Sequence, residues 1–186
     1  MKEVLVWSKF IRIWHWLLVF NIILLLLSAE FEVQNLHAGA GIFTVVLSLI
    51  RIIYGFYDKG YASFSNFVKG PKEVIEFAKK TLRKTEEDYI GHNPLAGYIM
   101  VYIMFAVIVT AVFGISVFLI EKEIFSSINS VQNIEEINKI LSKIHKAISI
   151  SIFAAAILHI MGLIRHILVK KENIVKSMIN GKKQIK

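Results

Sequence analysis

The chain has 186 residues, with 22 lysines and arginines against 14 acidic residues, so its formal net charge at pH 7 is +8. Its residues are 55% hydrophobic and its mean hydropathy is +0.59, which indicates an integral membrane protein. The lack of cysteine excludes disulfides, thiolate-bound zinc and cysteine-ligated iron–sulfur clusters. In so apolar a chain, basic residues mark cytoplasmic loops rather than a nucleic-acid surface, so we expect no nucleic-acid partner.

Four segments lack acidic and basic residues and are long enough to cross, or nearly cross, a membrane: 13–29, 33–50, 89–120 and 147–164. We expect helices at about 10–29, 34–57, 94–120 and 144–168, forming an all-α integral membrane four-helix bundle as a single domain over residues 1–186. Basic residues before the first run resemble the start of a signal peptide, but His15 between Trp14 and Trp16 favours a retained span.

The connections between the expected spans differ in length and charge. Only a few residues separate the first two spans, so these helices must form an antiparallel hairpin. The segment 71–84 has apolar residues on one side and lysines mostly opposite, which predicts a short amphipathic cytoplasmic helix on the membrane surface or against a partner. With both termini cytoplasmic, eighteen of the 22 basic residues lie inside, so we predict an N-in, C-in protein of the bacterial inner membrane.

The antiparallel helices place four histidines at two depths. His145 and His159 are fourteen positions apart, so they share a helix face at a separation of ~21 Å. In the predicted topology His15 lies at the inner level with His159, and His37 lies at the outer level with His145. Histidines within a membrane are costly unless they are paired or ligated.

These pairs favour two haems over a bare metal ion. Zinc requires four ligands at one point, whereas the four histidines are divided between two depths. Two imidazoles on either side of an apolar macrocycle fit the hydrophobic surroundings, and only the haem propionates then need polar partners. We expect one haem b ligated by His15 and His159 and a second by His37 and His145.

Other residues suit accessory roles. Arg12 and Arg51 could meet propionates of the inner haem, although each could equally be an anchor on the inner side. Gly39, Gly41 and Gly114 could leave room for a macrocycle, or could serve plain helix packing. His92 precedes the third span, where capping competes with a role in quinone binding or proton transfer.

Several of these residues occur in motifs of a known family. They are 12–16 (RIWHW), His37 followed by Gly39 and Gly41, 91–97 (GHNPLAG), and the spacing of His145 and His159. Together they make the chain similar to the cytochrome b subunits of nickel–iron hydrogenases and the bacterial cytochrome b561 proteins. The resemblance implies a four-helix dihaem cytochrome in which positions 15, 37, 145 and 159 are the axial ligands.

The resemblance also implies electron transfer between a periplasmic redox partner and the quinone pool. A hydrogenase-like subunit and a c-type cytochrome are both reasonable partners, and a homodimer is open. We expect an electron-transfer subunit rather than a self-contained enzyme. One alternative is a stand-alone quinol or superoxide oxidoreductase of the cytochrome b561 type, and a second is a haem-free anchor for a soluble subunit.

Overall fold

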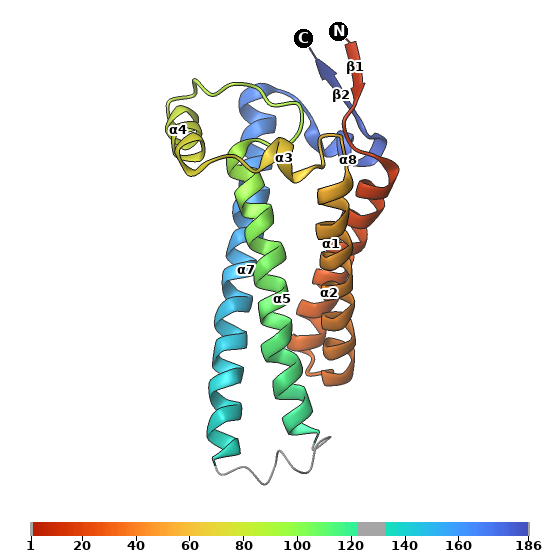
Figure 1. The fold of residues 1–186 in the computed structure, drawn as a ribbon, viewed down its shortest axis with the longest axis vertical. Helices are drawn as coiled ribbons and strands as arrows, with labels where there is room; N and C mark the ends of the chain where they lie inside the picture. Colours follow the sequence, from red (N-terminus) through yellow and green to blue (C-terminus); the bar gives the residue numbers. More distant parts are fainter. Residues whose placement is uncertain (1, 123–132, 186) are drawn as a thin grey trace. The chain divides into compact units, whose positions relative to one another are not determined.

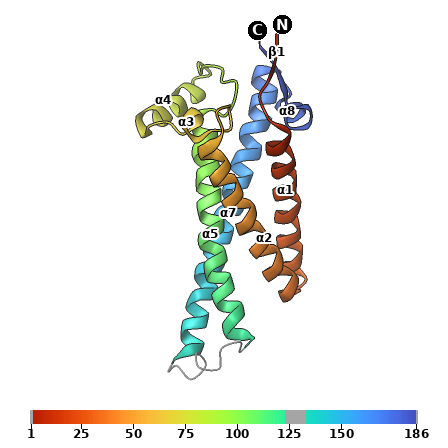
Figure 2. The same ribbon diagram turned by 45° about the vertical axis from the view of Figure 1, so that its right-hand side comes forward.

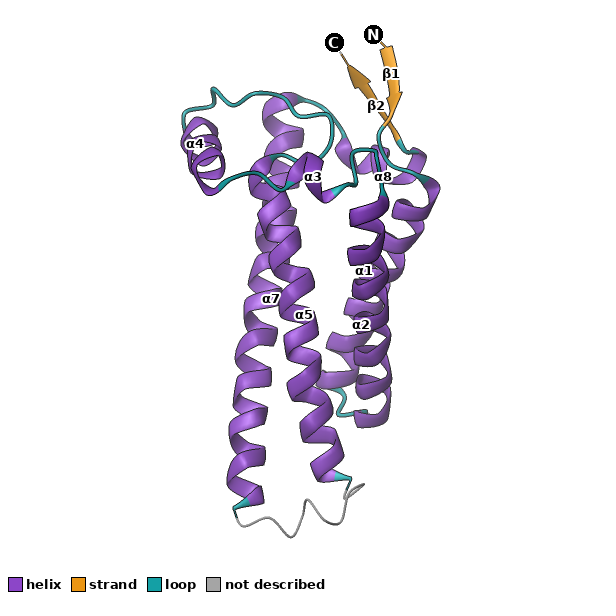
Figure 3. Cartoon of the chain, viewed as in Figure 1, coloured by secondary structure: helices purple, strands orange, loops and turns teal. Residues whose placement is uncertain are grey.

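The computed structural model describes residues 2–122 and 133–185, and its helices and strands are labelled in Figure 1. In chain order these are β1 (Lys2–Leu5), α1 (Lys9–Glu30), α2 (Gln34–Tyr57), α3 (Phe64–Phe67), α4 (Pro71–Leu82), α5 (Pro94–Glu121), α7 (Ile134–Lys170), α8 (Ile174–Asn180) and β2 (Lys182–Ile185). Figure 3 shows that the described fold is helical apart from the two short strands. The expected all-α membrane class is confirmed.

Within the described residues, four helices are long and apolar enough to cross a membrane: α1, α2, α5 and α7. Helix α5 begins where the sequence changes from polar to apolar. Pro94 occupies its first turn, and the Asn93 side-chain oxygen accepts the backbone N–H of Ala96 at 2.8 Å. Helix α7 is continuous, so the segment from Ile134 and the last expected span form one helix.

The chain divides into two compact units. The first comprises residues 1–16, 50–102 and 155–186, and the second comprises residues 17–49 and 103–154. The first unit contains the strands, α3, α4 and α8, together with parts of the long helices.

A buried polar contact joins α1 to α2 in the second unit. Asn21 is only 4% exposed, and its amide donates to the carbonyl of Ala40 at 2.9 Å and to the hydroxyl of Thr44. A polar side chain in hydrocarbon needs such partners, because no water is available to satisfy it. The contact therefore aligns the two helices of the hairpin.

In the first unit the two ends of the chain pair with each other. Strands β1 and β2 are antiparallel, with Glu3 opposite Gln184 and Leu5 opposite Lys182 (Figure 3). Before β2, Gly181 ends α8 in the left-handed conformation (φ 83°), which glycine adopts without a steric penalty. The sequence analysis did not predict this strand pair, because the C-terminal segment is rich in lysine and has no alternation of apolar and polar residues.

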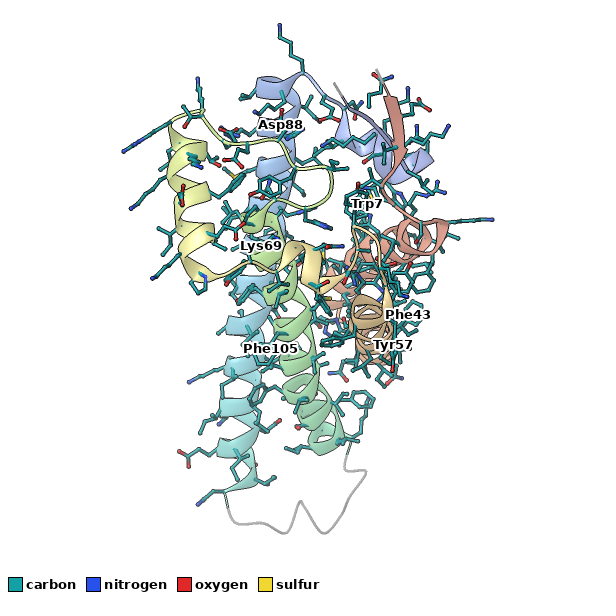
Figure 4. The ribbon with its side chains drawn as sticks, turned by 45° about the horizontal axis from the view of Figure 1, so that its top comes forward. Trp7, Phe43, Tyr57, Lys69, Asp88 and Phe105 are labelled. Atoms are coloured by element: carbon teal, nitrogen blue, oxygen red, sulfur yellow. The ribbon has the colours of Figure 1, made fainter. Side chains whose placement is uncertain are left out.

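Ion pairs hold the loop after α4 against the end of α7 in the first unit. Arg165 binds the Glu86 carboxylate at 2.7 Å and the carbonyl of Thr81 at 2.7 Å, and Lys170 binds Asp88 at 2.9 Å. Figure 4 shows Asp88 beside this end of α7. The side chain of Glu86 is 4% exposed, and its hydrogen bond with Arg165 lowers the pKa of this carboxyl group.

The Glu86–Arg165 pair predicts a pH-dependent contribution to stability. Because the folded-state pKa of Glu86 is lowered, the contribution is present above the ordinary glutamate pKa of about 4.3 and is lost as pH falls through the folded value. We expect Glu86→Gln to destabilise the protein by about 1–3 kcal/mol at pH 7 and by less at pH 2, which is well below the ordinary glutamate pKa and nearer the lowered folded value. Thermal unfolding in detergent at both pH values measures this.

Glu73→Gln is the matched control, since Glu73 is exposed in the first turn of α4 and forms no ion pair in the described part of the chain. It should leave the melting temperature unchanged at both pH values. Equal effects of the two substitutions at pH 7 would contradict a specific role for Glu86.

Candidate functional site

The second unit brings His37 of α2 next to His145 of α7. Their ring centres are 6.1 Å apart, and the ring planes are inclined by 78°. His37 Nδ1 lies 3.1 Å from the carbonyl oxygen of Leu25, and His145 Nδ1 lies 2.9 Å from the carbonyl oxygen of Thr110. A carbonyl oxygen only accepts hydrogen bonds, so both Nδ1 atoms carry the proton and both Nε2 atoms keep a free lone pair.

This arrangement fits two imidazoles on opposite sides of one metal ion. A bond of about 2 Å to an imidazole nitrogen places each ring centre roughly 3 Å from the metal, so two axial imidazoles have centres about 6 Å apart. Histidine ligands usually donate their other N–H to a carbonyl or carboxylate, as both rings do here. Among the described residues, no group of three or more His, Asp or Glu side chains could hold a metal ion, so the donors here are a pair.

Glycines shape the surroundings of this pair. A Cβ atom on Gly114 would lie 2.7 Å from Cε1 of His145, so the missing side chain makes room for this imidazole rather than for a macrocycle. A Cβ atom added to Gly39 or Gly41 would meet no atom within 4 Å, so open space lies beside both residues on α2. Room for a flat group beside Gly39 and Gly41 therefore stays a prediction, whereas Gly114 makes room for His145.

The first unit contains His15 of α1 and His159 of α7. Both are partly buried, and they are close enough to interact electrostatically. Nδ1 of His15 is buried without a hydrogen-bond partner. Unlike the rings of the second unit, this imidazole therefore retains an unsatisfied polar atom, as expected of a group that awaits a ligand or a further partner.

Arg51 of α2 is a buried cation in the same unit. Its side chain is 1% exposed and lies near the rings of Trp14, Phe64 and Phe67, at 5.9, 5.4 and 5.8 Å from the ring centres. One guanidinium nitrogen donates to the carbonyl of Ala62 at 2.8 Å, whereas Nε and Nη1 are buried without partners. Two free donors on a buried cation fit an anionic acceptor such as a carboxylate, with each nitrogen able to donate one charge-assisted hydrogen bond.

Arg12 has a partner within the protein. Its Nη1 donates to the carbonyl of Ile179 in α8, while its Nε is buried without a partner. Trp16, one turn further along α1, donates to the carbonyl of Met178 at 3.2 Å. Arg12 thus fastens the C-terminal segment, and it retains less free capacity for an anion than Arg51 does.

His92 lies just before the first turn of α5 and close enough to Arg51 to interact with its charge. Its ring packs between Trp7 and Phe67, with ring centres 4.8 and 5.1 Å away, and its Nδ1 is buried without a partner. Burial and the charge of Arg51 lower the pKa of His92 to about 3, so this imidazole is neutral at physiological pH. A neutral imidazole can both donate and accept a hydrogen bond.

Sequence reasoning missed several residues around these groups. Ser28 is buried, and its hydroxyl lies 3.3 Å from Nδ1 of His37. Its position just before the short connection to α2 could have been a signal, since a hairpin brings the end of α1 close to His37. The carbonyls of Leu25 and Thr110 leave no trace in side-chain chemistry, so no sequence pattern could have indicated them.

Comparison with known proteins gives one match. The family model described as prokaryotic cytochrome b561 matches residues 6–181, a range that includes all the candidate site residues named from the sequence. Neither the curated proteins nor the solved structures contain a match.

Proposed function

This chain belongs to the prokaryotic cytochrome b561 family, and from that premise we propose that it is a dihaem cytochrome of the bacterial inner membrane. Family membership indicates a membrane-bound b-type cytochrome that binds haem b and transfers electrons. The proposal adds that electrons pass between a periplasmic redox partner and the quinone pool. The observation that carries it is the His37–His145 pair, whose spacing and hydrogen bonds fit axial ligation.

His37 and His145 would hold one haem iron. Haem b supplies a one-electron carrier where it is bound. The chain's own contribution is to hold each imidazole through a backbone carbonyl, which selects the tautomer and raises the basicity of Nε2. Apolar helices on either side keep water away from the macrocycle.

His15 and His159 would hold the second haem iron, with Arg51 as the partner of a propionate. The support is the unsatisfied Nδ1 of His15 and the two free guanidinium nitrogens of Arg51 in the same unit. Arg12 is a secondary candidate, because only its Nε is buried without a partner, whereas Arg51 has two such nitrogens.

Quinone would react near the second haem, and His92 would relay the protons. The support is the buried, unpartnered Nδ1 of His92, together with its electrostatic interaction with His15 and His159. In the N-in, C-in topology this unit faces the cytoplasm, and the periplasmic partner docks at the other side. We propose residues 30–36 and 121–143 as its docking surfaces, because they are the polar segments on the predicted outer side; residues 123–132 lie outside the described part of the chain.

The haem assignment predicts the pigment content of histidine variants. The wild-type protein should bind two haems b per chain, and replacing any of the four ligands by alanine should remove about one. The pyridine haemochromogen assay on purified protein measures this content.

His166→Ala is the matched control, since His166 lies on the same helix as two ligands but pairs with Glu172 at 3.0 Å. It should keep both haems. A colourless wild-type protein would instead support a haem-free membrane anchor.

The surroundings of the two histidine pairs also predict an order of midpoint potentials. Carbonyl acceptors on His37 and His145 make these ligands more basic, which lowers the potential, whereas the buried charge of Arg51 raises the potential at the His15–His159 site. Electron transfer would then favour the direction from the outer site to the inner site. A spectroelectrochemical titration should resolve a lower component that disappears in His37→Ala and a higher component that disappears in His15→Ala.

Arg51→Gln should lower the midpoint potential of the higher component, assigned to the His15–His159 site, and leave that of the lower component unchanged. An interaction of roughly 1.4 kcal/mol corresponds to about 60 mV in a one-electron couple. The lower component serves as an internal control, and a shift of both components by the same amount would argue against a local effect of Arg51.

The quinone assignment predicts a kinetic defect without loss of haem. In His92→Ala, reduction of the bound haem by a short-chain quinol should slow by at least about ten-fold, because general acid–base contributions are of this size or larger. Stopped-flow absorbance measures the rate, with His166→Ala as control. If quinone-site inhibitors still act fully on His92→Ala, the side assigned to quinone is wrong.

A further inference from the structure

The main apolar face of helix α4 packs against other residues of the first unit. Phe77 is buried, and its ring centre lies 5.5 Å from that of Tyr89 in the loop that follows. Val74, Ala78 and Thr81 lie on the same side and are half-buried. The face that made this helix amphipathic in the sequence therefore packs at least partly within the first unit and is not all available to a membrane.

A second apolar strip on α4 remains uncovered. Ile75 is 56% exposed and Leu82 is 85% exposed, and their spacing of seven residues places them on the same side of the helix. We call these two residues the apolar ridge. Both are large aliphatic side chains with nothing in the described part of the chain that covers them.

Cations lie along one edge of the apolar ridge. Lys72 and Lys79 have the same seven-residue spacing and lie about 60° around the helix from it, and Arg83 follows Lys79 by four residues. All three are exposed and form no ion pair in the described part of the chain. By contrast, Lys80 on the far side binds Glu76 and Glu87, both at 3.1 Å, so its charge is neutralised.

The position of α4 within the first unit suits the headgroup region of a membrane. The hydroxyl of Tyr98, in the second turn of the membrane-spanning helix α5, donates to the carbonyl of Lys69 at 2.9 Å, two residues before α4. Figure 2 shows α3 and α4 beside the beginning of α5, and a Cβ atom on Gly97 would lie 2.6 Å from the carbonyl oxygen of Phe67. The start of α4 is therefore held at the level of the first turns of a span. Figure 4 shows the side chains of α4, with Lys69 labelled at its start.

We propose that this edge of α4 binds anionic phospholipid. Ile75 and Leu82 contact the upper acyl chains, while Lys72, Lys79 and Arg83 bind lipid phosphates. Two apolar side chains with three cations are too small for a stable protein interface, which buries about 800 Å² on each partner, but they match the footprint of a lipid headgroup with its first methylenes. The proposal does not depend on the number of haems or on their ligands.

The natural lack of cysteine makes a site-specific probe possible. Leu82→Cys is labelled with bimane in the full-length protein and reconstituted into nanodiscs of phosphatidylcholine alone or with one-third phosphatidylglycerol. Glu73→Cys, on the opposite side of α4, is the matched control. We expect the Leu82 probe to report an apolar environment and to be quenched by spin-labelled phosphatidylglycerol about five-fold more than by spin-labelled phosphatidylcholine, while the Glu73 probe reports water.

Removing the three cations tests the role of charge. In Lys72→Gln/Lys79→Gln/Arg83→Gln the roughly five-fold preference for phosphatidylglycerol at position 82 should be lost, so that both lipids quench about equally. Lys139→Gln/Lys143→Gln/Lys146→Gln removes the same number of charges from α7 and should leave the preference unchanged. A probe at position 82 that reports water in both lipids would overturn the proposal, and so would equal quenching by the two lipids while the three cations are present.

Discussion

Hydrogen bonding in a medium without water is the constraint on which the second unit depends. A buried N–H that has no partner in hydrocarbon costs several kcal/mol, so an acceptor within the protein stabilises a polar side chain there. His37 and His145 meet this requirement through backbone carbonyls, and Asn21 meets it through α2. The same bonds that remove the penalty also orient each imidazole, so the stability of the helices and the geometry of the site have one cause.

Buried side-chain atoms without a partner occur in both units, since Thr110 Oγ1 and Asn138 Oδ1 of the second unit are also unsatisfied. In the first unit they include Nδ1 of His15, Nδ1 of His92 and two nitrogens of Arg51. Native proteins contain few such atoms, and those that persist mark places where a ligand, a water molecule or an ion completes the structure. The aromatic rings around Arg51 offset part of the cost of burying its charge, but they offer it no acceptor. The proposed ligands of this unit would supply partners for these nitrogens.

The sequence predicted the structure well where a residue type or a long apolar run occurs in a membrane protein for only a few reasons. Apolar length predicted the class of fold, and the rarity of histidine in lipid pointed to His37 and His145, which the structure places 6.1 Å apart. It was uninformative where the partner is a backbone atom, as for the carbonyls of Leu25 and Thr110. The strand pair and α8 were also missed, because short charged segments take their structure from tertiary contacts, such as those of Arg12 and Trp16 with α8.

The pairing of the two chain ends has a consequence for biogenesis. Residues near position 12 emerge from the ribosome long before their partners near position 179, so the start of α1 has to wait until α8 has been synthesised. Until then Arg12 and Trp16 have no carbonyls of α8 to bind. A nascent chain that is interrupted late would insert its apolar helices and still display an unfinished first unit, which a membrane protease would recognise.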